Sequence, residues 1–217
     1  MLKMKFDINS GALIKILCLG AHCDDLEIGC GGTILKILNT LSNTEVDWIV
    51  FSGKGKRAGE AKNSAISFLI DAKKTNIEIK GFKDGFFPYT GAEIKNHFEE
   101  LKRRISPDLI FTHYRNDLHQ DHRLISELTW NTFRDHLIFE YEIVKYDGDI
   151  GSPNLFFHLD EHVCRKKIDL ILNTFKSQKT RNWFTEDSFL SIMRLRGLES
   201  NSNSRFAEGF YCRKVIA

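Results

Sequence analysis

Residues 12–33, ALIKILCLGAHCDDLEIGCGGT, form the stretch that decides the fold. The run from Ala12 to Gly20 is almost continuously apolar, which is the pattern of a strand buried on both faces. A polar, glycine-rich turn follows, and the chain then has apolar residues at helical spacing at Ile34, Leu35, Ile37, Leu38 and Leu41. A buried strand that leads through a polar turn into a helix is typical of the first unit of an α/β fold.

Strands and helices alternate in this way through the first 135 residues. The further strands are predicted at Val46 to Phe51, Ile77 to Phe82 and Asp108 to His113. The further helices are predicted at Arg57 to Ala72, from a Thr90/Glu93 capping box to Pro107, and through Leu124, Leu128 and Phe133. Right-handed crossovers between such elements produce a mainly parallel sheet, so the sequence predicts an α/β fold.

The last third of the chain continues the same domain. Strands are predicted near Tyr141 to Tyr146, at Leu155 to Leu159 and near Phe210 to Val215, and helices at Glu161 to Phe175 and Asp187 to Leu195. A chain of 217 residues is long enough for one α/β domain with a sizeable core and short for two. We expect residues 1–217 to form a single domain.

Composition limits the partners and the compartment. The 31 basic and 29 acidic side chains leave a net charge of +2, which argues against a protein built to coat nucleic acid or an anionic membrane. Five cysteines without a C-x-x-C pair indicate reduced thiols. No apolar run approaches the roughly 20 residues that span a bilayer, and Asp7 and Lys15 interrupt the N-terminal segment that superficially suggests a leader. We expect a cytoplasmic protein with a small-molecule partner, no nucleic acid and no membrane span, and the sequence leaves a homo-oligomer open.

Two clusters of ligand-type side chains follow predicted strands and open predicted helices. The first contains His22, Asp24 and Asp25, and the second is NDLHQDH at residues 116–122. In open α/β sheets, ligands bind beyond the carboxyl ends of the strands. Two carboxylates and a histidine directly after a buried strand are costly unless a cation compensates their charge. His22 and Asp25 can converge on one ion across the turn, and the second cluster would supply a further ligand.

This donor set predicts both a metal and a division of roles. Histidine and carboxylate ligands suit zinc, and three protein ligands leave a position open for water, although Fe²⁺ accepts similar ligands. If Asp25 is a ligand, its neighbour Asp24 points elsewhere and is free to take the proton from the metal-bound water. His119 would stabilise the oxyanion and then protonate the departing amine. Asp121 would accept a hydrogen bond from His119 and keep it charged.

The segment AHCDDLEIGCGGT, with HQDH further on, resembles the motifs of the PIG-L/LmbE-like zinc-dependent N-acetylglucosaminyl deacetylase family. The resemblance implies a single-domain, Rossmann-like three-layer fold with helices on both faces of the sheet. It implies zinc ligands at His22, Asp25 and His122. It also implies a general base at Asp24 and an oxyanion-stabilising acid at His119.

Weaker similarity to the family extends over most of the chain. By this similarity Arg57 would touch the substrate and Asp84 would hold a sugar hydroxyl. The clearest departure is Cys23, where the family usually has proline, and its thiol could coordinate the metal or be oxidised. We expect His113 and Asp117 to support the ligands rather than to bind the metal.

The sequence therefore predicts hydrolysis of the N-acetyl group of an amino sugar, sugar conjugate or sugar nucleotide, which releases acetate and a free amine. One alternative keeps the metal site and changes the substrate to a non-sugar amide. Another is a metal-binding or nucleotide-binding module without turnover. The G-x-G-G spacing at residues 29–32 differs from the G-x-G-x-x-G dinucleotide motif, which makes nucleotide binding the weaker interpretation.

Overall fold

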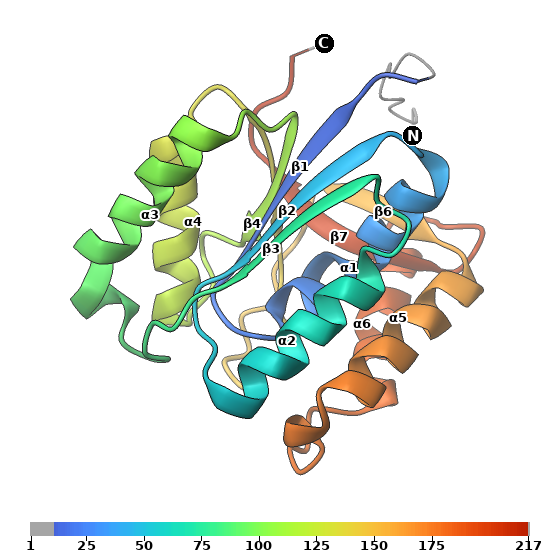
Figure 1. Ribbon diagram of the computed structural model, residues 1–217. Coiled ribbons are helices and arrows are strands. Elements are labelled where there is room, and N and C mark those ends of the chain that lie inside the picture. The colour runs from blue at the N-terminus through green and yellow to red at the C-terminus, as the bar shows by residue number, and fades with distance from the viewer. Residues whose placement is uncertain (1–10, 217) are drawn as a thin grey trace.

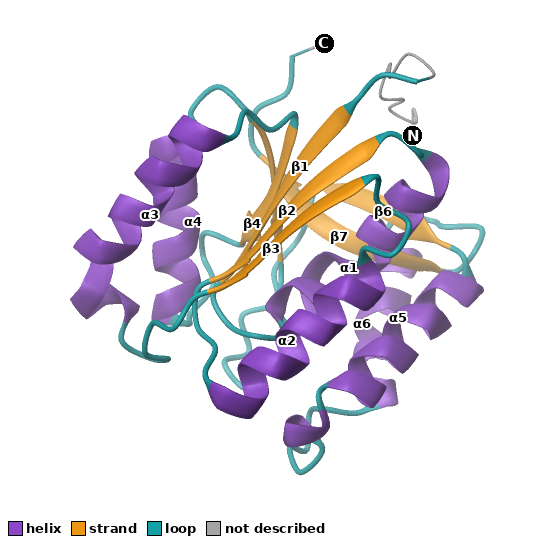
Figure 2. Ribbon diagram, viewed as in Figure 1, coloured by secondary structure: helices purple, strands orange, loops and turns teal. Residues whose placement is uncertain are grey.

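The fold is built on one seven-stranded sheet within residues 11–216, the part of the chain that the computed structural model describes (Figures 1 and 2). The strands are β1 (Ile14–Gly20), β2 (Thr44–Val50), β3 (Lys74–Ile79), β4 (Leu109–His113), β5 (Leu137–Tyr141), β6 (Leu155–Leu159) and β7 (Phe206–Cys212). They lie in the order β3-β2-β1-β4-β5-β7-β6. Strands β1 to β5 run parallel, whereas β7 is antiparallel to both of its neighbours. The predicted α/β fold with a mainly parallel sheet is confirmed.

Helices cover both faces of this sheet. They are α1 (Asp25–Thr40), α2 (Gly55–Phe68), α3 (Gly91–Arg104), α4 (Gln120–Thr132), α5 (Glu161–Thr174) and α6 (Glu186–Glu199), with short 3₁₀ turns at Phe87–Thr90 and Lys176–Gln178. Figure 1 shows α3 and α4 on one face and the other four on the opposite face. The central strand explains this arrangement, because successive side chains of a strand point to opposite faces. Ile16 and Cys18 are buried in one core, and Leu17 and Leu19 in the other.

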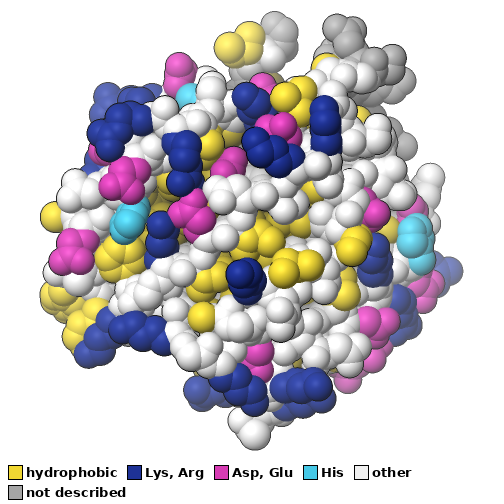
Figure 3. Space-filling model, viewed as in Figure 1, with side chains coloured by type: hydrophobic (Ala, Val, Ile, Leu, Met, Phe, Trp, Pro, Cys, Tyr) yellow, Lys and Arg dark blue, Asp and Glu magenta, His cyan; other side chains and the backbone are white. Residues whose placement is uncertain are grey.

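The surface has mixed charge, as the composition indicates. On the face shown in Figure 3, basic side chains lie interspersed with acidic ones, and hydrophobic side chains gather in the middle, over the β3 edge. Within the described residues, none of the helices combines the length and the apolarity that crossing a bilayer requires. The prediction that the N-terminal segment is not a leader concerns residues 1–10, which lie outside the described part.

Three predicted strands lie a few residues from their observed positions. The strand expected at Ile77 to Phe82 is β3, which ends at Ile79. The strand expected near Tyr141 to Tyr146 is β5, which ends at Tyr141, and the strand expected near Phe210 to Val215 is β7, which ends at Cys212. Pairing sets these limits, because β5 stays level with β4 from Leu109 opposite Leu137 to His113 opposite Tyr141. An apolar pattern alone does not contain this register.

The predicted capping box is wrong in its hydrogen bonds, although the helix begins where expected. Thr90 is the residue before α3, but its side chain makes no capping hydrogen bond. Its hydroxyl instead donates to the carbonyl of Phe86 at 3.4 Å, within the preceding 3₁₀ turn. The Thr90 hydroxyl therefore hydrogen-bonds within the preceding turn and not, as the capping pattern predicts, to the first turn of α3.

Candidate metal centre

The two predicted clusters lie at the same edge of the sheet, on neighbouring strands. From β1 the chain builds outward through β2 to β3, and then returns to the other side of β1 as β4. His22 follows β1, Asp25 begins α1, and His122 lies in the first turn of α4, directly after the loop from β4. This reversal of strand order is the position where open α/β sheets bind their ligands.

Three side-chain atoms from these clusters form a compact triangle. His22 Nδ1 lies 3.1 Å from His122 Nε2 and 3.4 Å from Asp25 Oδ2, and the remaining edge, from His122 Nε2 to Asp25 Oδ2, is 3.5 Å. A tetrahedral ion with bonds of about 2.0–2.1 Å needs ligand atoms roughly 3.3 Å apart. The side chains of His22, His122 and Asp25 are only 13%, 3% and 6% exposed, respectively. The residues present therefore fit a divalent metal.

Each histidine of the triangle has its second ring nitrogen against a carboxylate. His22 Nε2 is 3.2 Å from Asp121 Oδ2 and 3.0 Å from Asp84 Oδ1. His122 Nδ1 is 2.9 Å from Asp117 Oδ2. Such partners fix the ring orientation and the tautomer of a metal-binding histidine. Asp117 thus lies where it can orient the ring of His122.

The charges of the triangle also suit a cation. Burial, with help from His113, lowers the pKa of His122 to about 4, so its ring is neutral and can offer a lone pair. Burial alone would raise the pKa of Asp25, but the surrounding histidines hold that pKa well below its usual range. Burial opposes protonation of His22, yet Asp25 and Asp121 hold its pKa well above the usual value. A metal that binds there would displace this proton.

His113, the last residue of β4, lies beside the triangle. Its ring stacks on that of His122 with centroids 3.9 Å apart, and its Nε2 is 3.2 Å from Asp25 Oδ2. The same nitrogen accepts a hydrogen bond from the Ala21 amide at 2.9 Å. Because this lone pair accepts from the backbone, Nε2 carries no proton for Asp25, and His113 contacts the triangle mainly by stacking on His122. Asp25, His113 and His122 also offer ligand atoms within 4.8 Å of one another, so the supporting role of His113 stays a prediction.

Asp24 lies next to the triangle and is nearly inaccessible, at 6% exposure. Its Oδ1 accepts a hydrogen bond from Arg57 at 3.0 Å, and its Oδ2 has no hydrogen-bond partner among the described residues. Burial raises the pKa of this carboxyl group, and Arg57 opposes the shift. Although Asp24 immediately precedes α1, its side chain makes no capping bond to the helix. Helix capping therefore does not explain the carboxylate.

His119 lies beside the histidine pair, at the residue before α4. Its ring centroid is 4.9 Å from that of His22 and 4.6 Å from that of His122. Its Nδ1 accepts a hydrogen bond from the backbone amide of Asp121 at 3.2 Å. A neutral ring that accepts at Nδ1 carries its proton at Nε2, which can donate to another group.

The predicted hydrogen bond from His119 to the Asp121 carboxylate is wrong. This carboxylate is fully buried and accepts from the amides of Gly85 at 2.7 Å and Phe87 at 3.1 Å, in addition to its contact with His22. Asp121 lies in the first turn of α4, and its side chain reaches the loop after β3 rather than the preceding residue. Its place is behind a predicted metal ligand.

The two predicted substrate-binding residues differ in accessibility. Arg57 is bound to Asp24, and its side chain is 34% exposed. Asp84 is 73% exposed, although its Oδ1 lies against His22. Asp84 could also join His22 and Asp121 around an ion, because one atom from each lies within 4.8 Å of the others.

Cys23, which replaces the usual proline, is buried beside the turn. Its thiol donates to the carbonyl of Ser52 at 3.2 Å. Burial raises the pKa of the thiol to about 11, so it stays protonated near neutral pH. The side chain therefore fills space between the turns after β1 and β2.

Sequence reasoning missed one charged group in this region. Lys145 Nζ is 3.0 Å from Asp117 Oδ2 and also contacts Asp149. Lys145 and Asp149 belong to the irregular segment of residues 142–154, between β5 and β6. A lone lysine in an irregular segment carries no periodic signal, so only the folded chain reveals it.

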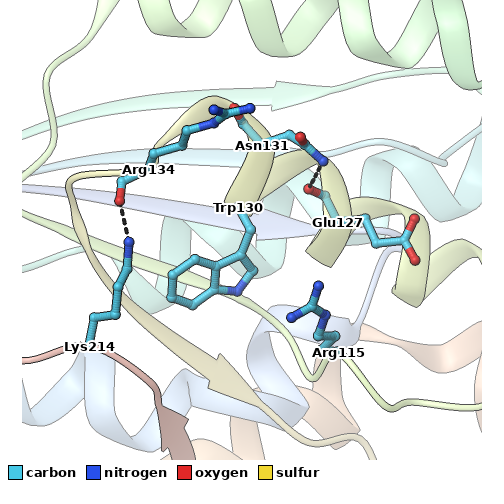
Figure 4. A pocket seen from close by; sticks show the side chains of 6 residues that line it. All are labelled: Arg115, Glu127, Trp130, Asn131, Arg134 and Lys214. Carbon is cyan, nitrogen blue, oxygen red and sulfur yellow. Dashed lines mark hydrogen bonds between the residues drawn. The ribbon is translucent and has the colours of Figure 1, made fainter.

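A separate hollow of about 440 Å³ lies at the far end of α4 (Figure 4). Two of its basic side chains satisfy backbone carbonyl groups at the end of the helix. Lys214 donates to the Arg134 carbonyl, and Arg134 donates to the Asn131 carbonyl. The negative end of a helix dipole also disfavours an anionic ligand. The residues that line the hollow are Arg115, Glu127, Trp130, Asn131, Arg134 and Lys214.

The chain is similar to known proteins in sequence and in fold. A diacetylchitobiose deacetylase from Thermococcus kodakarensis is 29% identical over 121 residues, a match that covers 50% of this chain and 44% of that protein. The chain thus matches less than half the length of this relative. The structure of the N,N'-diacetylchitobiose deacetylase from Pyrococcus horikoshii superposes with a TM-score of 0.73 at 21% identity, over 92% of this chain and 83% of that chain. The structure of GalB, the 4-carboxy-2-hydroxymuconate hydratase from Pseudomonas putida KT2440, superposes with a TM-score of 0.75 at 15% identity, over 94% and 99%.

These two structures, at such identities, establish the fold. The family evidence is the match of residues 17–133 to the GlcNAc-PI de-N-acetylase family, PIG-L, which covers more than half of the chain. The match begins within β1 and ends just after α4, so it includes both clusters of the triangle. The predicted resemblance is confirmed, and the chain belongs to the PIG-L family.

Proposed function

We propose that this protein is a metal-dependent N-deacetylase that hydrolyses the N-acetyl group of an amino sugar, sugar conjugate or sugar nucleotide. The observation that carries the proposal is the triangle of His22, Asp25 and His122, with Asp24 and His119 beside it. The family and the named deacetylase relatives support the same chemistry. The two imidazoles and one carboxylate favour zinc, and Fe²⁺ remains compatible with this donor set.

A divalent metal held by these three ligands would polarise the amide carbonyl and make a water molecule easier to deprotonate. Asp24 accepts the proton from the attacking water through the buried oxygen that has no partner among the described residues. Arg57 holds the other oxygen and so directs the carboxylate. The water oxygen bonds to the carbonyl carbon.

His119 acts on the carbonyl oxygen. Its Nε2 proton stabilises the carbonyl oxygen as negative charge develops there. The C–N bond then breaks as the Asp24 carboxyl group passes the proton that it took from water to the leaving nitrogen, and the acetic acid and free amine that result leave the site, the acid as acetate. We further propose that Arg57 and Asp84 contact the substrate, since both side chains are partly or largely exposed and contact Asp24 and His22, respectively. Asp84 offers oxygens to a sugar hydroxyl.

The test is acetate release from a panel of N-acetylated amino sugars by the metal-loaded full-length protein. Asp24→Asn and His119→Ala should each lower turnover by about 10²–10⁴-fold, the usual range for general acid–base groups. Asp135→Asn is the matched control, because its side chain is 91% exposed and pairs only with His136 among the described residues. Full turnover in both site variants would overturn the roles. Activity confined to non-sugar amides would support the alternative substrate class.

A further inference from the structure

Asp117 contacts three groups behind the predicted metal ligands. Its Oδ2 is 2.9 Å from His122 Nδ1 and 3.0 Å from Lys145 Nζ. Its Oδ1 accepts a hydrogen bond from the His119 amide at 2.8 Å. The residue is 2% exposed, so water does not substitute readily for these partners. One carboxylate thus orients the ring of a metal ligand and the backbone of a second site residue.

Lys145 reaches Asp117 from a distant part of the chain. Its ammonium group is shared between Asp117 and Asp149, and its side chain is only 13% exposed. Asp149 Oδ2 also accepts a hydrogen bond from the Leu118 amide at 2.7 Å. Two side chains of the segment of residues 142–154 therefore bind the loop before α4. Lys145 binds the Asp117 side chain, and Asp149 binds the Leu118 backbone amide.

This segment is itself held firmly at two points. Arg196, on α6 and 1% exposed, binds both carboxylate oxygens of Glu142, at 2.6 and 2.8 Å, and the Gly151 carbonyl at 2.9 Å. Bidentate pairs of this kind fix geometry as well as charge. Lys145 lies between the two attachment points. All of these groups follow residue 133, where the family match ends.

We propose that Lys145 is a positioning residue of the metal centre, which holds the Asp117 carboxylate in place against His122. Asp149 in turn holds Lys145. The proposal rests on the proposed function only in requiring a metal at the triangle. Loss of Lys145 leaves Asp117 with one charged partner fewer and frees it to rotate away from His122. Changes behind a metal ligand typically weaken metal binding by about 10–100-fold.

The direction of the effect separates positioning from simple charge. A lysine near a metal repels the cation, so removal of its charge alone would tighten metal binding. A positioning role predicts the opposite result for Lys145→Met. Lys145→Arg keeps a cationic donor and should restore most of the affinity. The matched control is Lys95→Met, because Lys95 forms a comparable set of contacts with Glu99 and Thr132 on α3 and α4.

The experiment measures Zn²⁺ affinity of the full-length protein by competition with a chelator, and the absorption spectrum of bound Co²⁺. Lys145→Met should weaken Zn²⁺ binding by about 10–100-fold and alter the Co²⁺ spectrum. Lys145→Arg and Lys95→Met should remain within about threefold of the unmodified protein on the same scale. Unchanged or tighter binding in Lys145→Met would overturn the proposal.

A double substitution tests whether Lys145 acts through Asp117. In an Asp117→Asn background, Lys145→Met should cost less than about threefold, because coupled residues are not additive. A full effect in that background would contradict the proposed route. If Lys145→Met fails to fold in a thermal scan, Asp149→Asn provides the second variant and should also weaken Zn²⁺ binding. No substrate is involved, so metal binding without acetate release would contradict the proposed function alone, whereas absence of metal binding would overturn both.

Discussion

Asp24 and Asp25 are adjacent in the chain, yet their surroundings give their carboxyl groups opposite tendencies. Burial raises the pKa of Asp24, and Arg57 is the largest of the influences that oppose this shift. Asp25 is equally buried, but three histidines hold its pKa well below its usual range. Groups whose pKa values are driven apart by their environments are suited to different roles, here proton acceptor and ligand.

The residue scale also yields a prediction for Cys23. Cys23→Ala should leave Zn²⁺ affinity within about threefold of the unmodified protein, because the thiol is engaged by the Ser52 carbonyl. The lost packing should lower the free energy of unfolding by roughly 1 kcal/mol. Chelator competition and urea unfolding measure the two quantities. A tenfold loss of affinity would show that the thiol coordinates the metal.

At the scale of the element, α1 depends on glycines for close packing. A Cβ at Gly29 would lie 2.2 Å from Cδ2 of Tyr141, whose hydroxyl is fixed by a hydrogen bond to the Leu19 carbonyl. A Cβ at Gly32 would lie 2.6 Å from Leu159 and 2.9 Å from Glu208. The glycines that suggest a nucleotide-binding motif thus allow the helix to approach strands β5, β6 and β7.

Gly29→Ala should therefore destabilise the protein by about 1–3 kcal/mol, the usual cost of overpacking. Gly59 offers the matched control, because it lies inside α2 and a Cβ there would meet nothing within 4 Å. Gly59→Ala should stabilise the protein by about 0.5–1 kcal/mol, through the helix propensity of alanine. Guanidinium unfolding of both variants checks the prediction, and equal effects would contradict it.

At the scale of the whole molecule, the C-terminal elements hold α1 through a buried ion pair. Lys167 on α5 lies 2.6 Å from Glu208 on β7 and donates to the Ile28 carbonyl at 2.7 Å. Glu208 also accepts from the amides of Gly32 and Thr33, at 2.8 and 2.6 Å. The helix that begins with a predicted metal ligand is thus fixed by parts of the chain more than 130 residues away.

Removal of one partner of this pair should be costly. Lys167→Met leaves a buried carboxylate without its cation and should lower the free energy of unfolding by about 3–5 kcal/mol. The double variant Lys167→Met/Glu208→Gln should recover part of that loss, because the uncompensated charge is gone. Denaturant unfolding of the single and double variants measures the difference. A loss below about 1 kcal/mol in the single variant would contradict this account.

Much of the fold was predictable because its signals are local. The run from Ala12 to Gly20, the helical spacing after it and the strand that ends at His113 each depend on residues close in sequence. The sequence also predicted that the two clusters lie near each other, because the carboxyl ends of parallel strands share one edge of a sheet. The position of β5 was less predictable, since its limits depend on pairing with β4.

The sequence by itself determined the alternation of strands and helices, the family, and the two clusters from which the candidate metal site is built. Only the tertiary structure decided that Asp121 supports His22 rather than His119, that Arg57 holds Asp24, and that Lys145 reaches Asp117. The physical reason is sequence distance. Periodicity and motif spacing describe neighbours along the chain, whereas these contacts join residues that meet only when the sheet has set the positions of the loops between them.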